Sequence, residues 1–149
     1  MLEFTVRDNG RGFTSEELSK ILDPFFTTKG RKKKIGLGVP LLREAVERCN
    51  GVFKLEALPQ GGVMVTARFP HDHLDRAPLG NIGGTISVLL LGHNSLDLTY
   101  QHLYNEQTFS FNTTEFKQQL GDIPLEQPEI LLWLEEHLTR EIANLKGGE

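Results

Sequence analysis

The chain has 149 residues, enough for a domain with a hydrophobic core, and 38% of them are hydrophobic. Its formal net charge of −4 gives no basic footprint for nucleic acid, so we expect no nucleic-acid partner. A lone cysteine argues against a disulfide framework, and neither a signal peptide nor a membrane-spanning apolar run is present, so the sequence predicts a cytoplasmic protein without a membrane span.

The first predicted element is a strand over residues 2–6. Apolar and polar residues alternate there, which is the period of a strand with one buried face. The buried face would carry Leu2, Phe4 and Val6.

The predicted strand runs into the sequence Asp8-Asn9-Gly10-Arg11-Gly12-Phe13. A carboxylate at the end of a strand can accept a charge-assisted hydrogen bond from an amino group such as the exocyclic amine of adenine, and Asp8 is the candidate. Gly10 and Gly12 can adopt positive φ and let a flat base approach closely. Taken alone, the stretch is equally compatible with an ordinary strand-to-helix turn.

A helix is predicted to begin after Thr14, which can act as N-cap and form a capping box with Glu17. We interpret this helix, which Pro24 ends, mainly as a brace for the neighbouring site. The next stretch changes from Phe25-Phe26 to a basic, glycine-bearing segment over residues 29–34. We favour a nucleotide lid in which Lys29 meets phosphate oxygens, over a solvated loop or a nucleic-acid patch.

The sequence Gly36-Leu37-Gly38 leads into a second predicted helix, whose apolar face is formed by Val39, Leu42, Val46 and Cys49. Free N–H groups at such a helix start suit phosphate, although no Walker A pattern is present. Cys49 is best explained as a core residue. Two alternating segments, 52–58 and 63–69, then predict an antiparallel hairpin around Pro59-Gln60-Gly61-Gly62.

Taken in order, three of these motifs resemble the ATP-binding domain of the gyrase, Hsp90, histidine-kinase and MutL group (GHKL), most closely its histidine-kinase branch. Residues 8–13 match the first glycine box, 23–29 the phenylalanine box and 34–41 the second glycine box. The resemblance implies an α+β fold, the Bergerat-type α/β sandwich of histidine-kinase-like ATPases, over residues 1–70. It also implies ATP and Mg²⁺ as cofactors.

The resemblance assigns the nucleotide-binding roles residue by residue. Asp8 would accept a hydrogen bond from the adenine, and Gly10 and Gly12 would let the base approach closely. Lys29, Gly36 and Gly38 would hold or cover the phosphates, and the resemblance also counts Phe25 and Leu37 among the nucleotide-binding residues. Val63 stands where the family usually has a threonine near the adenine, and Lys34 or Ile35 where the second glycine box usually begins with glycine.

The resemblance also implies a helix that precedes the first glycine box, and this sequence does not contain it. In the family, a helix ahead of the first glycine box carries an asparagine that helps to hold Mg²⁺ and, in several branches, a glutamate that acts as general base. We therefore expect an N-terminally incomplete domain with no catalytic residue and no metal-ligating residue assigned.

Residues 71–78 are predicted to be a linker. His71 and His73 lie two residues apart in it, but a metal site needs further ligands in a defined geometry, so we favour a solvated linker. Residues 79–149 are predicted to be a small α/β C-terminal extension. Its expected elements are a helix over 79–91, strands over 96–102 and 108–111, a short helix opened by Asn112, and a long helix over 128–145.

Two functions remain open from the sequence. The first is an ATP-binding protein related to histidine-kinase and anti-sigma ATPases, which hydrolyses ATP or transfers its phosphoryl group. The alternative is a catalytically inactive regulatory or assembly subunit that uses the fold and the C-terminal helix for protein–protein interaction. A protein partner is expected in either case, and self-association is compatible with both.

Overall fold

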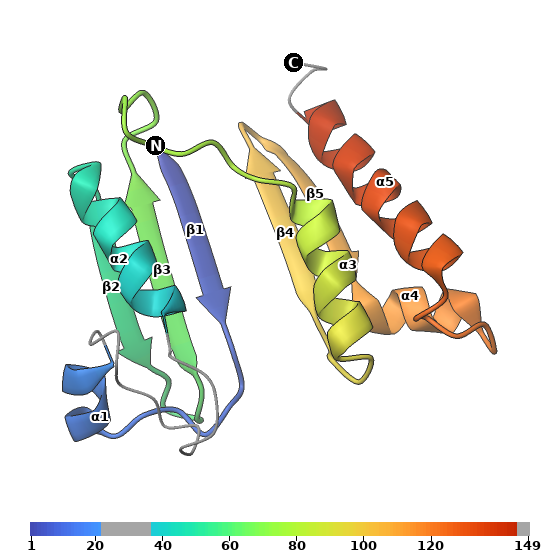
Figure 1. Ribbon diagram of the computed structural model, residues 1–149, viewed down its shortest axis with the longest axis horizontal. Coiled ribbons are helices and arrows are strands. Elements are labelled where there is room, and N and C mark those ends of the chain that lie inside the picture. The colour runs from blue at the N-terminus through green and yellow to red at the C-terminus, as the bar shows by residue number, and fades with distance from the viewer. Residues whose placement is uncertain (22–36, 146–149) are drawn as a thin grey trace. The chain divides into compact units, whose positions relative to one another are not determined.

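The structure is a computed structural model that describes residues 1–21 and 37–145. The chain divides into two compact units, Met1–Pro78 and Leu79–Glu149, here called the N-terminal unit and the C-terminal unit (Figure 1). Each unit has its own sheet and its own helices, so each is described by itself.

The N-terminal unit is a three-stranded antiparallel sheet with helices. Its strands lie in the order β1-β3-β2. In chain order its elements are β1 (Leu2–Arg7), α1 (Ser15–Lys20), α2 (Gly38–Arg48), β2 (Val52–Ala57) and β3 (Val63–Phe69). The hairpin predicted around residues 59–62 is confirmed, because β2 pairs with β3 in register from Val52 opposite Arg68 to Ala57 opposite Val63.

The core of the N-terminal unit lies between α2 and the sheet. Val46 on α2, Cys49 at its C-cap and Ala67 on β3 are almost fully buried, which agrees with the predicted apolar face of this helix and the core role of Cys49. Helix α2 packs on β2 and β3 (Figure 1).

The predicted burial of the β1 face is wrong. Phe4 is 38% exposed and Val6 is 48% exposed, although both lie on the same face of the sheet as Ala67 and Val65, their direct partners on β3. The alternation does produce a strand with an apolar face. Since α2 lies over β2 and β3, the β1 part of that face stays open within the described part of the chain.

The C-terminal unit is a β-hairpin packed with three helices. Its elements are α3 (Ile82–Gly92), β4 (Thr99–Tyr104), β5 (Gln107–Asn112), α4 (Thr113–Leu120) and α5 (Pro128–Leu145). The predicted element types are confirmed, but α3 begins three residues later than expected, β4 is shifted toward the C-terminus, and β5 is one residue longer at each end than expected. Among the described residues, no helix has the length and apolar content required to cross a membrane.

The core of the C-terminal unit is centred on the contact between α3 and α5. Leu90, Leu134 and Leu138 are fully buried there. Gly83 allows the two helices to approach, because a Cβ at this position would lie 2.6 Å from the carbonyl oxygen of Glu135.

Candidate nucleotide-binding site

The predicted adenine-reading residue, Asp8, is held in place at the end of β1. Its N–H donates to the carbonyl oxygen of Val63 at 3.0 Å, which continues the β1–β3 ladder by one residue. Its side-chain Oδ1 accepts a hydrogen bond from the N–H of Gly10 at 2.8 Å. Asp8 is exposed, and this bond uses only one carboxylate oxygen, so the other can accept a bond from a ligand.

The loop that follows Asp8, residues 8–14 (the Asp8 loop), packs directly against the turn between β2 and β3, residues 59–62 (the glycine turn). Gly62 has a φ of +87°, and a Cβ there would lie 2.0 Å from the carbonyl oxygen of Asp8. Gly12 has a φ of +73°, and a Cβ there would lie 3.1 Å from the carbonyl oxygen of Gly62. The two backbones can therefore touch only because both positions are glycine.

The other end of the Asp8 loop is fixed by Glu17 on α1. The predicted capping box is confirmed: Glu17 accepts from the N–H of Thr14 at 2.9 Å, and the Thr14 hydroxyl accepts from the N–H of Glu17 at 3.1 Å. Glu17 also accepts two hydrogen bonds from the Arg11 guanidinium, at 2.8 and 3.1 Å. The Arg11 hydrogen bond, followed by that from the Thr14 backbone, lowers the pKa of Glu17 to about 2.

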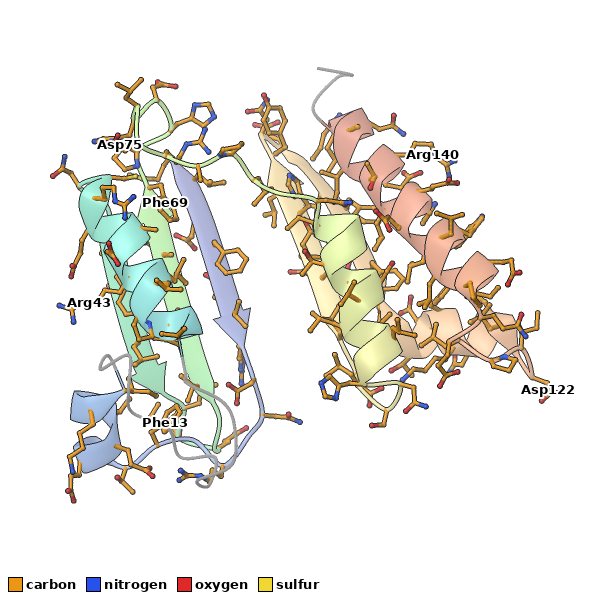
Figure 2. All side chains as sticks on the ribbon, in the orientation of Figure 1. Phe13, Arg43, Phe69, Asp75, Asp122 and Arg140 are labelled. Atoms are coloured by element: carbon orange, nitrogen blue, oxygen red, sulfur yellow. The ribbon has the colours of Figure 1, made fainter. Side chains whose placement is uncertain are left out.

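The Arg11–Glu17 pair is a feature that the sequence analysis missed. The two charges are six residues apart and lie on either side of the N-cap, so no helical or strand periodicity brings them together. The guanidinium carbon of Arg11 also lies 5.8 Å from the centre of the Phe13 ring. Figure 2 shows Phe13 at the end of the N-terminal unit where this loop lies, and Phe69 at the opposite end.

The start of helix α2 lies at the same end of the sheet. Figure 1 shows that α2 begins where β1 ends and where β2 turns into β3. Its N-cap, Leu37, provides no side-chain hydrogen bond, and the first turn carries no acidic residue. Within the described ranges, therefore, neither the N-cap side chain nor an acidic residue of the first turn satisfies these N–H groups or opposes the positive end of the helix dipole.

The structure brings five of the eight predicted site residues to this end of the sheet. Asp8, Gly10 and Gly12 lie in the Asp8 loop, and Leu37 and Gly38 lie at the start of α2. A Cβ added to Gly38 would meet no atom of the described residues within 4 Å. The remaining three residues, Phe25, Lys29 and Gly36, lie outside the described residues.

The histidines of the predicted linker do not gather with other metal ligands. His71 contacts Asp72 at 2.7 Å through Nδ1, and His73 accepts from the N–H of Asp75 at 3.2 Å. In the described ranges, 1–21 and 37–145, no group of three or more His, Cys, Asp or Glu side chains could hold a metal ion.

A hollow of about 190 Å³ in the C-terminal unit is not a second candidate ligand site. Its polar lining includes Asn94, Lys117 and Glu126. These groups bond within the protein: Asn94 donates to Glu126, and Lys117 donates to the carbonyl oxygen of Leu96 at 3.1 Å. The hollow therefore presents no converging set of free polar groups.

Comparison with known proteins supports the assignment of the N-terminal unit. A family described as "Histidine kinase-, DNA gyrase B-, and HSP90-like ATPase" matches residues 1–73. The sensor histidine kinase ZraS of Klebsiella oxytoca is 33% identical over 69 residues, which are 46% of this chain and 14% of that protein. Sporulation kinase A of Bacillus subtilis is 35% identical over 66 residues, which are 44% of this chain and 11% of that protein.

A third relative shows the same pattern of partial similarity. The C4-dicarboxylate transport sensor protein DctB of Pseudomonas aeruginosa is 36% identical over 61 residues, covering 41% of this chain and 10% of that protein. The chain thus spans only a small part of the length of these relatives. Residues 1–73 are therefore a domain of the histidine kinase-, DNA gyrase B- and HSP90-like ATPase type.

Proposed function

We propose that the N-terminal unit binds ATP, with Asp8 as the residue that reads the adenine. The observation that carries the proposal is the fixed Asp8 carboxylate, which is held by the Gly10 N–H at 2.8 Å and remains exposed. An ionised carboxylate that presents a free oxygen favours a base with an amino group over one with a carbonyl at the same place. ATP is therefore preferred to GTP, whose base has a carbonyl oxygen there.

The proposed binding site for the phosphates of the nucleotide is the start of α2. The first N–H groups of α2, which the side chain of its N-cap Leu37 does not satisfy, and the helix dipole attract anions, and no acidic side chain in the first turn opposes them. Gly38 leaves room for a phosphate to approach the backbone. We extend the phosphate-binding region to Lys29 and Gly36, with Phe25 as an anchor, on the basis of the sequence motifs alone.

Domains of this family bind ATP with Mg²⁺. The described residues contain no cluster of metal ligands, so we assign no protein ligand to the ion and derive no step from it. The ATP phosphates themselves are oxygen ligands for Mg²⁺.

The proposed chemistry is phosphoryl transfer to a histidine or hydrolysis of ATP, because the matched relatives are sensor histidine kinases and a sporulation kinase. A regulatory or assembly role is the second candidate. It is favoured by the surface of the C-terminal unit, where Trp133 is 50% exposed although it stacks on Phe116 and His137. Half-exposed aromatic side chains of this kind are common anchors in protein interfaces.

The proposal is tested by calorimetric titration of the chain with Mg·ATP and, separately, with Mg·GTP. Wild type is compared with Asp8→Asn, which keeps an amide oxygen for the Gly10 N–H but removes the charge and turns a donor toward the base. Hydrogen bonds to charged groups contribute about 1.5–3 kcal/mol, so we expect Asp8→Asn to weaken ATP binding by about ten- to a hundredfold.

Asp75→Asn is the matched control, because this exposed aspartate lies at the opposite end of the N-terminal unit (Figure 2). It should bind ATP as the wild type does. If Asp8→Asn also binds ATP with unchanged affinity, or if GTP binds as tightly as ATP, the assignment of Asp8 is wrong. If wild type binds neither nucleotide, the regulatory or assembly role becomes the better explanation.

A further inference from the structure

We propose that the outward face of α5 is a self-association surface, on which the α5 helices of two copies of this chain pair antiparallel about a two-fold axis. This face is formed by four residues, here called the α5 stripe: Glu129, Trp133, Glu136 and Arg140. The inference goes beyond the proposed function and does not depend on nucleotide binding. It rests only on the C-terminal unit, which has its own hydrophobic core.

Helix α5 already uses its strongest apolar face inside the C-terminal unit. Leu131, Leu134 and Leu138 are buried in the core, where α5 packs on α3 and the β-hairpin (Figure 1). The hydroxyl of Ser87 on α3 donates to the carbonyl oxygen of Leu131 at 3.1 Å, which fixes the helix on that side. A partner of α5 must therefore bind the opposite face, where the α5 stripe lies.

The α5 stripe has the spacing of helices that pair lengthwise. Its members are separated by four, three and four residues, which is the alternation that characterises a coiled-coil seam. All four are exposed: Trp133 is 50% exposed and the Arg140 side chain is 63% exposed. Leu132, which borders the stripe, is 58% exposed, so pairing along this face also removes two large apolar side chains from water.

Three groups of the α5 stripe have no hydrogen-bonding partner among the described residues. They are the carboxylates of Glu129 and Glu136 and the indole N–H of Trp133. The Trp133 ring is nevertheless held in place, because it stacks on Phe116 and His137 with interplanar angles of 3° and 8°. An aromatic side chain that is fixed in advance loses little conformational entropy on binding, which favours its use as an anchor.

An antiparallel pair with its axis at the middle of residues 134–135 gives each of these groups a partner. Glu129 falls opposite Arg140 of the second copy, and Trp133 falls opposite Glu136. The Glu129 carboxylate can then accept from the guanidinium, and the Glu136 carboxylate can accept from the indole N–H. Since the axis is two-fold, each of these contacts forms twice.

Arg140 can make this contact although it already has neighbours. Its guanidinium lies 3.1 Å from Nδ1 of His137, and its Nε lies 3.6 Å from a carboxylate oxygen of Glu141. A guanidinium has five N–H donors, so these two local contacts leave donors for Glu129 of the second copy.

Other registers of the same helix pair bring like charges together or leave the helix. A parallel pair places Glu129 opposite Glu129 and Glu136 opposite Glu136. Sliding the antiparallel pair by one turn places Glu129 opposite Glu136 in one direction and Glu136 opposite Glu136 in the other, and like charges facing each other are unfavourable. A slide by a whole heptad places Glu129 or Glu136 opposite a residue beyond an end of α5. Only the proposed register gives every group of the stripe a complementary partner.

The net charge of the C-terminal unit opposes the pairing at long range. Residues 79–149 include ten acidic and three basic residues, so two copies repel each other. At physiological ionic strength this repulsion is screened beyond about 8 Å, whereas the ion pairs of the α5 stripe are direct contacts. The experiments are therefore made at physiological salt.

Sedimentation velocity across a concentration series tests the pairing. We expect the 16.8 kDa chain to shift toward twice that mass at high micromolar concentration, because an interface of this size makes a weak dimer. Glu129→Arg and Arg140→Glu each bring like charges together twice, and each should weaken the dimer about tenfold or more. The double variant, Glu129→Arg with Arg140→Glu, exchanges the two charges and should restore the wild-type dimer.

Glu106→Arg is the matched control, because it makes the same change of charge in the exposed turn between β4 and β5, outside α5. It should not weaken the dimer, and far-UV circular dichroism checks that all variants fold. Fluorescence of Trp133, the single tryptophan, locates the interface. Its emission should move to shorter wavelength as the wild type dimerises, because the ring then loses contact with water.

The proposal is overturned by a single 16.8 kDa species at every concentration of the wild type, by dimers of unchanged strength in both single charge reversals, or by a double variant that dimerises no better than they do. It is also overturned by dimers whose Trp133 emission does not change, since such dimers use another surface.

Discussion

Gly62 is the residue whose substitution tests most directly how the candidate site is built. Its backbone has a φ of +87°, and a Cβ would lie 2.0 Å from the carbonyl oxygen of Asp8 and 2.8 Å from its carbonyl carbon. These atoms belong to the backbone, so they cannot rotate away as a flexible side chain can. Gly62→Ala must therefore either separate the glycine turn from the Asp8 loop or distort both.

The expected loss of stability has two parts. Backbone strain at such a φ costs about 1–3 kcal/mol, and forcing extra volume into a close contact costs about 1–3 kcal/mol, so the free energy of unfolding should fall by roughly 2–6 kcal/mol. The measurement is urea unfolding followed by two signals. Far-UV circular dichroism reports the whole chain, whereas fluorescence of Trp133, the single tryptophan, reports the C-terminal unit and serves as internal reference.

We expect the circular dichroism transition of Gly62→Ala to gain an early component while the fluorescence midpoint stays as in wild type. Gly38→Ala is the control, because its Cβ would meet no atom within 4 Å and the residue lies in a helix. It should be as stable as wild type or slightly more stable, since alanine favours a helix over glycine by up to about 1 kcal/mol. Unchanged unfolding of Gly62→Ala would refute the contact between the turn and the loop.

Two further substitutions test the Arg11 pair and the α3–α5 contact. Since the hydrogen bonds from Arg11 and from the Thr14 backbone lower the pKa of Glu17 from 4.5 to about 2, these interactions stabilise the folded state above about pH 4.5 and lose this contribution as the pH falls toward 2. The difference in urea midpoint between wild type and Glu17→Gln should therefore be present at pH 7 and shrink at pH 2, and a difference that does not change with pH would contradict the assignment. Gly83→Ala places a Cβ 2.6 Å from the Glu135 carbonyl oxygen and should cost about 1–3 kcal/mol by tryptophan fluorescence, whereas Gly92→Ala, with nothing within 4 Å, should not. Equal midpoints for these two variants would argue against close helix packing.

Features that depend on neighbouring residues were predictable from the sequence. The capping box of Thr14 and Glu17 is confirmed in both of its hydrogen bonds, because its geometry is set within four consecutive residues. The hairpin around residues 59–62 is confirmed for the same reason, since turn residues and alternation fix it locally. The start of α3 shows the limit of this reasoning. Asn81 accepts from the N–H of Gly84 and begins the helix at Ile82, so a local cap decides a boundary that apolar content alone had placed at residue 79.

Features that join distant parts of the chain could not be predicted. Gly61 and Gly62 were interpreted only as turn residues, and nothing in their local sequence indicates that the turn packs on a loop about fifty residues earlier. The exposure of Phe4 and Val6 has a similar cause. Alternation predicts an apolar face, but whether that face is covered depends on where α2 packs.

The Asp8 loop is held by three contacts, and substitutions at the support and at Asp8 itself should weaken nucleotide binding in different ways. The ladder bond to Val63, the contact with Gly62 and the hydrogen bonds of Glu17 come from three separate elements, and each restricts the loop without touching the outer oxygen of Asp8. Asp8→Asn removes the contact with the base, whereas Glu17→Gln leaves that carboxylate intact and only loosens its support. Because ordering a loop on binding costs free energy that a fixed loop does not, Glu17→Gln should weaken ATP binding while the preference for ATP over GTP remains. Asp8→Asn should lose the preference together with the affinity.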